Sequence, residues 1–347
     1  MIKNKFTLKF LKIIQIIVWT VGLIIVFCLF FYPQIGLTIF WDILIPVAPF
    51  LLVIASGIWR NICPLATTNL LPRHFNLSKR KIMSSLTQSK LQLISIVALY
   101  TLVPLRHVLF NTNGMATGFL LLGAAFIGLI MSSQYDWKSG WCASLCPIHP
   151  VEKLYGSNTI LTLPNAHCTS CVNCSVPCPD ATPNINPSIV KKNIFQKINA
   201  ILTIGGLPGF IWGWFHVADT TQKISIDDII TTYRMPIIGF SLTVLLYILL
   251  NFLITKKNKI NWLIEASFLR KYFAAASVST YYWYRIPALI GFGKFKNDGI
   301  LFDLKPYITN WSVIALTIFT TLFFFSWFLL RAPNKKSWLI RPSYAVK

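Results

Sequence analysis

The sequence contains few charged residues, and very few of these are acidic. Asp, Glu, Lys and Arg make up 12% of the 347 residues, whereas soluble domains carry about 25%. The mean hydropathy is correspondingly high, at +0.61. This composition excludes an ordinary soluble domain and indicates a membrane protein.

The shortage of acidic residues leaves 10 Asp and Glu against 32 Lys and Arg, and a net charge of +22. The basic residues do not gather in one stretch. They fall in short clusters between apolar runs, which is the pattern of the positive-inside rule. We therefore predict no nucleic-acid partner, and membrane lipid as the main environment.

The chain also lacks internal repeats and low-complexity linkers. Its apolar residues form eight stretches near the ~20 residues that a bilayer crossing needs. They lie at residues 13–31, 37–58, 91–110, 116–132, 194–216, 236–254, 272–291 and 308–330. We predict an all-α polytopic membrane protein with about eight transmembrane helices. Its parts are a four-helix region (1–132), a polar segment (133–193), and a second four-helix region with a basic tail (194–347).

The basic clusters also predict the orientation of the helices. Lys and Arg concentrate in residues 1–12, 59–90, 133–193, 255–271 and 331–347, which places both termini and the polar segment in the cytoplasm. The first apolar run is too long for a signal peptide and is interpreted as an uncleaved anchor. Residues 272–291 carry Arg285 near their end, and the loop that follows is mildly basic; if these residues only lie on the surface, the C-terminus faces outward.

Cysteine is the residue type that carries the chemistry. Of eight cysteines, Cys28 lies in the first apolar run, and the other seven fall in predicted cytoplasmic segments. A reducing compartment argues for metal ligation rather than disulfides. Residues 168–179 contain the pattern C-x2-C-x2-C-x3-C-P, formed by Cys168, Cys171, Cys174 and Cys178. This spacing is typical of a [4Fe–4S] cluster in a ferredoxin-like loop rather than of zinc.

Two further Cys-Pro elements lie outside this run. Residues 140–150 read GWCASLCPIHP, with Cys142 and Cys146 four apart, and residues 57–65 read GIWRNICPL, with Cys63 before Pro64. The two elements look alike, except that Trp59 stands where a partner for Cys63 would be. Packing of these cysteines at the membrane edge is the structural alternative to a ligand role.

Seven cytoplasmic cysteines are one short of two all-cysteine cubanes, so several arrangements stay open. One cluster uses the four cysteines of the run and leaves Cys142 and Cys146 as a dithiol. Alternatively, Cys168, Cys171 and Cys174 take Cys146 or Cys63 as the fourth ligand. Cys178 and the remaining two then hold a second cluster, with an open site or with His149 or His74.

Together, the membrane spans, the W-x-x-x-C-P and C-x-x-x-C-P elements and the cysteine run resemble the membrane-bound polyferredoxin family. Its members include the quinol-dehydrogenase-type ferredoxin subunit of periplasmic nitrate reductase systems and the membrane portion of the nitrous oxide reductase expression protein. The resemblance covers residues 36–190. It implies electron transfer between a quinol pool or cytoplasmic donor and a partner oxidoreductase or maturation system. The chain departs from the family in having one ferredoxin run and in Trp59.

Ionisable residues in the spans are further candidates, because they are costly in a membrane. Asp42, Arg106, His107 and His216 are predicted near the outer ends of their helices, as are Asp219 and Arg285. They could bind a quinone headgroup, or the two histidines could ligate a haem iron. The simpler alternative is that Asp42 pairs with Arg106 and that the others reach the interface.

These observations predict an iron–sulfur electron-transport subunit of a bacterial cytoplasmic membrane. We expect an electron-transfer component of an oxidoreductase system rather than a complete enzyme, because no substrate-pocket motif is visible. The alternative is a redox assembly or maturation factor for a metalloenzyme. A transporter with a redox-sensing cluster ranks last, because the spans show no symmetric broken helices.

Overall fold

The computed structural model describes residues 2–81, 83–135, 138–156, 159–160, 163–164, 193–220, 225–257, 262–295, 299–331 and 339–340. Nearly all of them are helical. The elements are α1 (Ile2–Phe31), α2 (Pro33–Leu37), η1 (Thr38–Leu44), α3 (Ile45–Ile62), α4 (Pro64–Thr68), α5 (Leu71–His74), α6 (Ser85–Leu102), η2 (Pro104–Arg106), α7 (Gly114–Gln134), η3 (Lys138–Leu145), α8 (Ile148–Tyr155), β1 (Leu163–Pro164), α9 (Ile194–Ala200), η5 (Ile201–Gly205), α10 (Gly206–Trp214), α11 (Ile226–Lys257), α12 (Trp262–Leu289), α13 (Asn310–Leu330) and β2 (Leu339–Ile340). η1, η3 and η5 are π-helical, η2 is a 3₁₀ turn, and β1 and β2 pair in parallel.

Seven helical segments of the described chain are long and apolar enough to cross a membrane. They are Lys9–Phe31, Pro33–Thr68, Ser85–Arg106, Gly114–Gln134, Ile194–Trp214, Ile226–Ile254 and Asn310–Leu330. The chain is therefore an α-helical multi-pass membrane protein. The predicted eighth span, 272–291, lies in α12 up to Leu289, and α12 is not among the seven. α12 is less apolar because it contains Arg270, Lys271, Arg285 and several tyrosines.

Side-chain caps and prolines set many helix ends. Four helices begin after a residue whose side chain accepts a hydrogen bond from a first-turn backbone N–H: Ser84 for α6, Asn113 for α7, Asn193 for α9 and Thr309 for α13. Apolarity alone is a poorer guide to these ends, as α11 shows. α11 begins ten residues before its predicted span, because Ser225 and Asp228 cap each other's backbone at its start.

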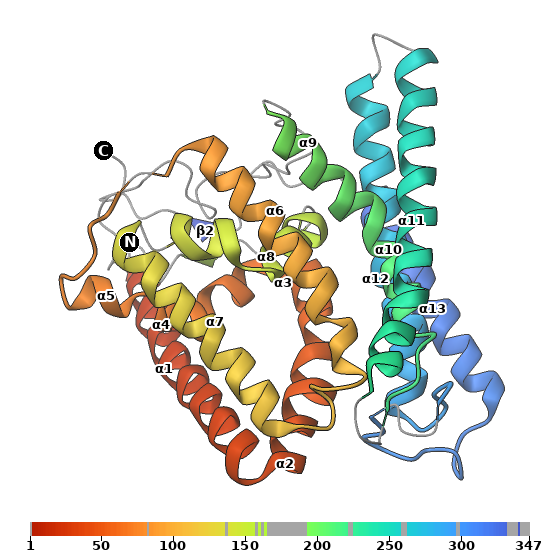
Figure 1. Cartoon of the computed structure of the whole chain (residues 1–347), viewed down its shortest axis with the longest axis horizontal. Helices are drawn as coiled ribbons and strands as arrows, with labels where there is room; N and C mark the ends of the chain where they lie inside the picture. The colour runs from red at the N-terminus through yellow and green to blue at the C-terminus, as the bar shows by residue number, and fades with distance from the viewer. Residues whose placement is uncertain are drawn as a thin grey trace.

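The helices gather in two groups, as Figure 1 shows: α1, α2, α4 and α7 on one side, and α10 to α13 on the other. α1 contacts α3, α4 and α7, whereas α10 packs against α11 and α12, and α12 packs against α13. The main hydrophobic core joins α3, α8, η5, α12 and α13. Its most buried members include Val53, Tyr155, Ile204, Val278 and Phe328. α8, which directly follows the second Cys-Pro element, is therefore fixed in the core.

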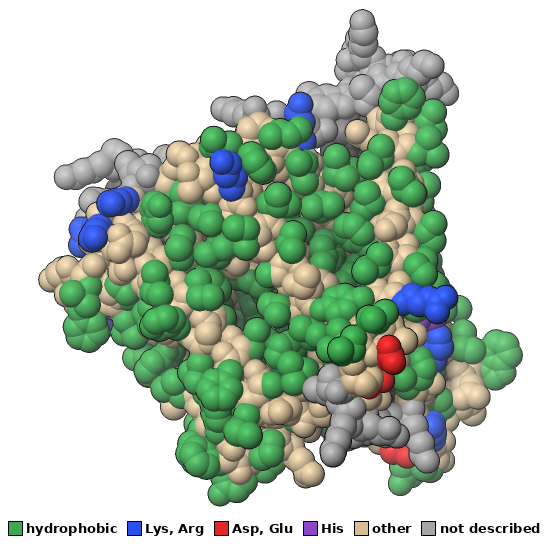
Figure 2. Space-filling view, viewed as in Figure 1, with side chains coloured by type: hydrophobic (Ala, Val, Ile, Leu, Met, Phe, Trp, Pro, Cys, Tyr) green, Lys and Arg blue, Asp and Glu red, His purple; other side chains and the backbone are tan. Residues whose placement is uncertain are grey.

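The surface is predominantly apolar. Figure 2 shows hydrophobic side chains over most of the visible face. On α11 alone, Leu242, Leu245, Leu249 and Phe252 are each more than half exposed. Apolar exposure on this scale is unusual for a soluble monomer and fits contact with lipid.

Candidate functional site

The prolines after Cys63 and Cys146 place both cysteines just outside helices. A residue before proline is driven away from the helical conformation, and Cys63 adopts φ −57° and ψ 117° between α3 and α4. Cys146 follows η3 in the same way, with Pro147 after it. Each Cys-Pro element therefore presents its thiol at a helix end.

The two elements meet in space. Cys142 and Trp141 of η3 form a small buried core with Ala66 and Leu70, and Cys63 and Cys146 pack against it. Cys146 also interacts electrostatically with both other thiols. We call Cys63, Cys142 and Cys146 the cysteine cluster. Of the sequence-predicted ligands, the structure therefore brings together the three cysteines that lie outside the ferredoxin-like run.

Glutamine side chains of α6 hold the cysteine-bearing segment in place. Gln88 and Gln92 both donate to the carbonyl oxygen of Ala143, at 3.3 and 2.8 Å. Ala143 lies directly after Cys142, within the π-helical segment η3. α6 thus fixes the backbone between Cys142 and Cys146.

A buried ionic triad lies beside the cysteine cluster. The Arg60 guanidinium pairs through Nε with Glu152 Oε1, and its Nη2 lies 2.5 Å from Nδ1 of His149. All three residues are buried. Because arginine can only donate, His149 Nδ1 is the acceptor. The triad joins α3 to α8, one helical turn from Cys63 and from Cys146 respectively.

Burial and neighbouring charges determine the ionisation of this region. Burial lowers the pKa of His149 to about 3, and Arg60 acts in the same direction. Burial alone would raise the pKa of Glu152, but Arg60, His149 and Lys153 together outweigh it and hold this pKa below its usual value. Burial, followed by Cys142 and Cys63, raises the pKa of Cys146. A bound metal would reverse this last effect, because cations favour thiolates.

The ferredoxin-like run itself, Cys168, Cys171, Cys174 and Cys178, lies outside the described residues. Within the described part of the chain, no group of three or more His, Cys, Asp or Glu side chains is placed to hold a metal ion. His74, the alternative histidine ligand, is exposed on α5. Cys28, which was not expected to be a ligand, lies within α1.

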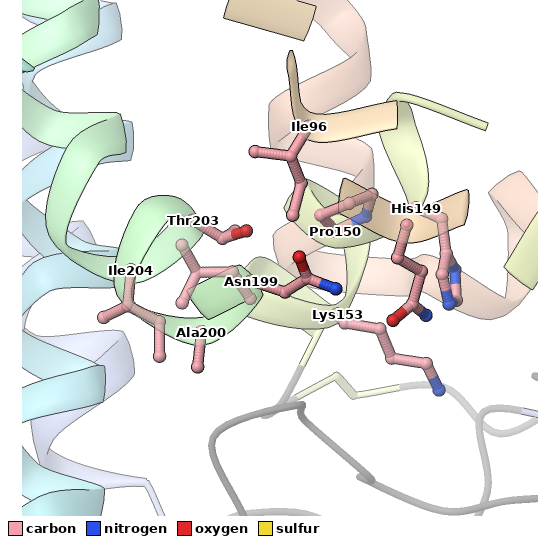
Figure 3. A pocket seen from close by; sticks show the side chains of 10 residues that line it. Ile96, His149, Pro150, Lys153, Asn199, Ala200, Thr203 and Ile204 are labelled. Carbon is pink, nitrogen blue, oxygen red and sulfur yellow. The ribbon is translucent and has the colours of Figure 1, made fainter. Parts of the chain in front are cut away.

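A small cavity adjoins the triad (Figure 3). It has a volume of about 30 Å³ and lies between α6, α8, α9 and η5, with His149, Lys153, Asn199 and Thr203 on its walls. Asn199 Oδ1 and Thr203 Oγ1 are buried there without a hydrogen-bond partner. The volume suits one or two water molecules, whereas a benzene ring needs about 150 Å³. Water, rather than an aromatic headgroup, fits this cavity.

The other ends of the helices carry a second polar group, the polar network of Asp42, Arg106, His107, Asp219 and Arg285. Asp42 Oδ1 accepts from Nη2 of Arg285 at 2.6 Å and from Nη2 of Arg106 at 3.3 Å. The Arg106 guanidinium also lies over the rings of Trp41 and Trp214. The structure thus pairs Asp42 with Arg106, as expected if these residues only satisfy each other's charge. It also pairs Asp42 with Arg285, which was not expected.

His107 uses both of its ring nitrogens within the polar network. Nδ1 lies 2.5 Å from Asp219 Oδ1, and Nε2 lies 3.1 Å from the carbonyl oxygen of Trp214. Neither nitrogen is left for a haem iron, so the predicted pair of histidines does not fit a haem in this arrangement. His216 Nδ1 lies 2.7 Å from the Trp212 carbonyl oxygen in its own helical turn.

Sequence reasoning missed the residues that surround the cysteine cluster: Arg60, Glu152, Gln92 and Asn69. The sequence offered two signals. Arg60 is a charged residue three positions before Cys63, and Glu152 is one of only 10 acidic residues in the chain. Comparisons with protein-family models, curated proteins and solved structures find no match to this chain.

Proposed function

We propose that this protein is a membrane-bound iron–sulfur electron-transfer subunit, as the resemblance to polyferredoxins suggests. One observation carries the proposal. Cys63 and the pair Cys142 and Cys146 come from Cys-Pro elements far apart in the sequence, yet they pack around one buried core. The ferredoxin-like run follows α8 in the chain. Seven thiols in all are thus candidates for cluster ligands.

The residues around the cysteine cluster suit an electron-transfer centre. Trp141 and Leu70 pack with Cys142, which is buried, and Arg60 provides a positive charge near all three thiols. A [4Fe–4S] cluster supplies one-electron transfer, and its potential depends on burial, nearby charge and hydrogen bonds to sulfur. This chain would hold the cluster at the membrane edge, exclude solvent, and set these factors.

The proposal places electron exchange at the cysteine cluster rather than at the polar network. The segment from Asp42 to Cys63 spans roughly 30 Å at about 1.5 Å per residue, so the two groups lie at opposite helix ends. By the distribution of Lys and Arg, the cysteine cluster faces the cytoplasm of a bacterial cell. The partner is then a cytoplasmic or membrane-embedded oxidoreductase or maturation subunit, and a quinone near the cytoplasmic face is a second electron donor.

Anaerobic purification with iron and acid-labile sulfide counts, followed by EPR after reduction, tests the proposal. We expect about four iron and four sulfide per chain for one cluster, or about eight of each for two. Cys146→Ser is expected to change the spectrum or the iron count, whereas the matched control Cys28→Ser is expected to change neither. Zinc without sulfide would overturn the proposal.

A further inference from the structure

Arg270 on α12 is a buried cation without a carboxylate partner among the described side chains. The residue is 6% exposed, and its Nε is buried with no hydrogen bond. Its electrostatic neighbours in the described chain are the Tyr247 phenol and the Lys271 ammonium. Three other buried arginines each pair with a carboxylate: Arg60, Arg106 and Arg285. Because an uncompensated buried charge is costly, Arg270 calls for an anion beyond the described side chains.

Two more basic residues lie at the same corner of the molecule. Lys271 Nζ donates to the carbonyl oxygen of Arg331 at 3.0 Å, which ties α12 to the end of α13. An ammonium has three donors, so two of them remain for another acceptor. The Arg331 guanidinium carbon lies 4.2 Å from the centre of the Trp327 ring. We call Arg270, Lys271 and Arg331 the basic corner.

The basic corner lies at the boundary of the membrane. Arg331 directly follows the apolar span Asn310–Leu330, and Lys271 contacts its carbonyl oxygen. Exposed apolar side chains flank the corner: Phe268 and Tyr272 on α12 and Leu330 on α13. The phosphate groups of lipids lie at this depth, next to their acyl chains. A lipid headgroup and its acyl chains therefore match the two kinds of surface.

We infer that Arg270 and Lys271 bind the phosphate of an anionic phospholipid, whose acyl chains lie against the exposed side chains of α12 and α13. A guanidinium group pairs with phosphate oxygens through two parallel hydrogen bonds. Basic sites between helices on the cytoplasmic side of a membrane bind anionic headgroups, and the distribution of Lys and Arg predicts that this end is cytoplasmic. The inference needs no cluster at the thiols, so it goes beyond the proposed function.

Lipid-dependent thermal unfolding of the full chain in detergent tests the inference. The probe is phosphatidylglycerol, compared with phosphatidylcholine of the same acyl chains and with inorganic phosphate alone. Because a ligand that binds only the folded state raises the midpoint of unfolding, the titration gives its affinity. We expect phosphatidylglycerol to raise the midpoint at concentrations at which the other two compounds do not.

Variants assign the binding to the basic corner. Arg270→Met removes the charge and keeps an unbranched side chain, and we expect it to weaken phosphatidylglycerol binding at least tenfold. Lys271→Gln is expected to weaken it about fivefold. The matched control is Lys197→Gln, which removes an exposed positive charge from α9 and should change the affinity less than about twofold. Without lipid, Arg270→Met should unfold at the same temperature as the wild type or higher, because it removes a buried charge that lacks a counter-ion.

Several outcomes would overturn the inference. Equal stabilisation by phosphatidylcholine or by inorganic phosphate would do so, as would an equal loss of affinity in Lys197→Gln. A lower midpoint for lipid-free Arg270→Met would show that Arg270 pairs within the chain, with the same consequence. If Arg270→Met yields no folded protein, Lys271→Gln decides the matter: an unchanged affinity there would contradict the inference. None of these outcomes alters the iron and sulfide counts that test the proposed function.

Discussion

The two ends of the helices both collect buried polar residues, but they differ in how completely these residues satisfy one another. In the polar network, both carboxylates are paired, and His107 uses both ring nitrogens. Beside the cysteine cluster, by contrast, the Asn69 amide is buried without a hydrogen-bond partner. Side chains that satisfy one another are stable without a ligand. We therefore interpret the polar network as a structural clamp and the cysteine cluster as the functional end.

The largest expected effect is in the clamp. Asp42→Ala removes the one carboxylate that both Arg106 and Arg285 share, so that two buried guanidinium groups lose their common counter-ion. We expect a loss of about 3–5 kcal/mol in the free energy of unfolding, measured by thermal unfolding in detergent. The control Asp227→Ala removes an exposed carboxylate from the start of α11, and should cost about 1 kcal/mol or less. Equal losses in the two variants would show that Asp42 is not a clamp.

A smaller effect is expected in the triad at the functional end. Glu152→Gln keeps the shape of the side chain but removes its charge, and Arg60 retains His149 as a second partner. We expect a loss of about 2–3 kcal/mol in unfolding free energy. A double variant with Arg60→Met should lose less than the sum of the single losses, because the two side chains form one buried pair. Strict additivity would contradict the pairing.

The triad also predicts a dependence of stability on acid. His149 has a pKa of 6.5 when unfolded and about 3 when folded, so the unfolded chain binds more protons between these values. Stability is therefore highest above pH 6.5 and falls as the pH drops towards 3, by at most about 1.4 kcal/mol per pH unit. Chemical unfolding at pH 7, 6 and 5 measures this slope. His149→Gln should flatten it, and an unchanged slope would show that another group is responsible.

The membrane helices and the Cys-Pro elements were predictable, because each depends on residues that are close together in the sequence. Long apolar runs predicted the seven membrane-spanning segments, although the eighth run, 272–291, is not among them. Asp42 and Arg106 were each predicted near the outer end of a helix, so their pairing was an expected outcome. Trp59 and the prolines marked the Cys-Pro elements. Contacts across the fold were not predictable in the same way. Whether Cys63 meets Cys142 depends on how α4 packs against η3.

The residues that sequence reasoning missed have a common property. A charge near the end of a membrane helix, such as Arg60, ordinarily reaches the interface, and only the packing of α8 against α3 pairs it with Glu152. Asn69 gives no signal in the sequence, because its unusual feature is the lack of a partner. The candidate site was therefore predictable in its cysteines but not in their surroundings.

The smallest expected effect concerns His216, and it tests whether the comparison between the two ends holds. His216 is partly exposed, bonds a carbonyl of its own turn, and stacks on Trp212. His216→Phe retains the stacking, so we expect a change within about 0.5 kcal/mol in unfolding free energy and no change in the cluster spectrum or its rate of reduction by a quinol analogue. If a quinone bound between His107 and His216, that rate would fall, and the polar network would have to be reassigned from a clamp to a ligand site.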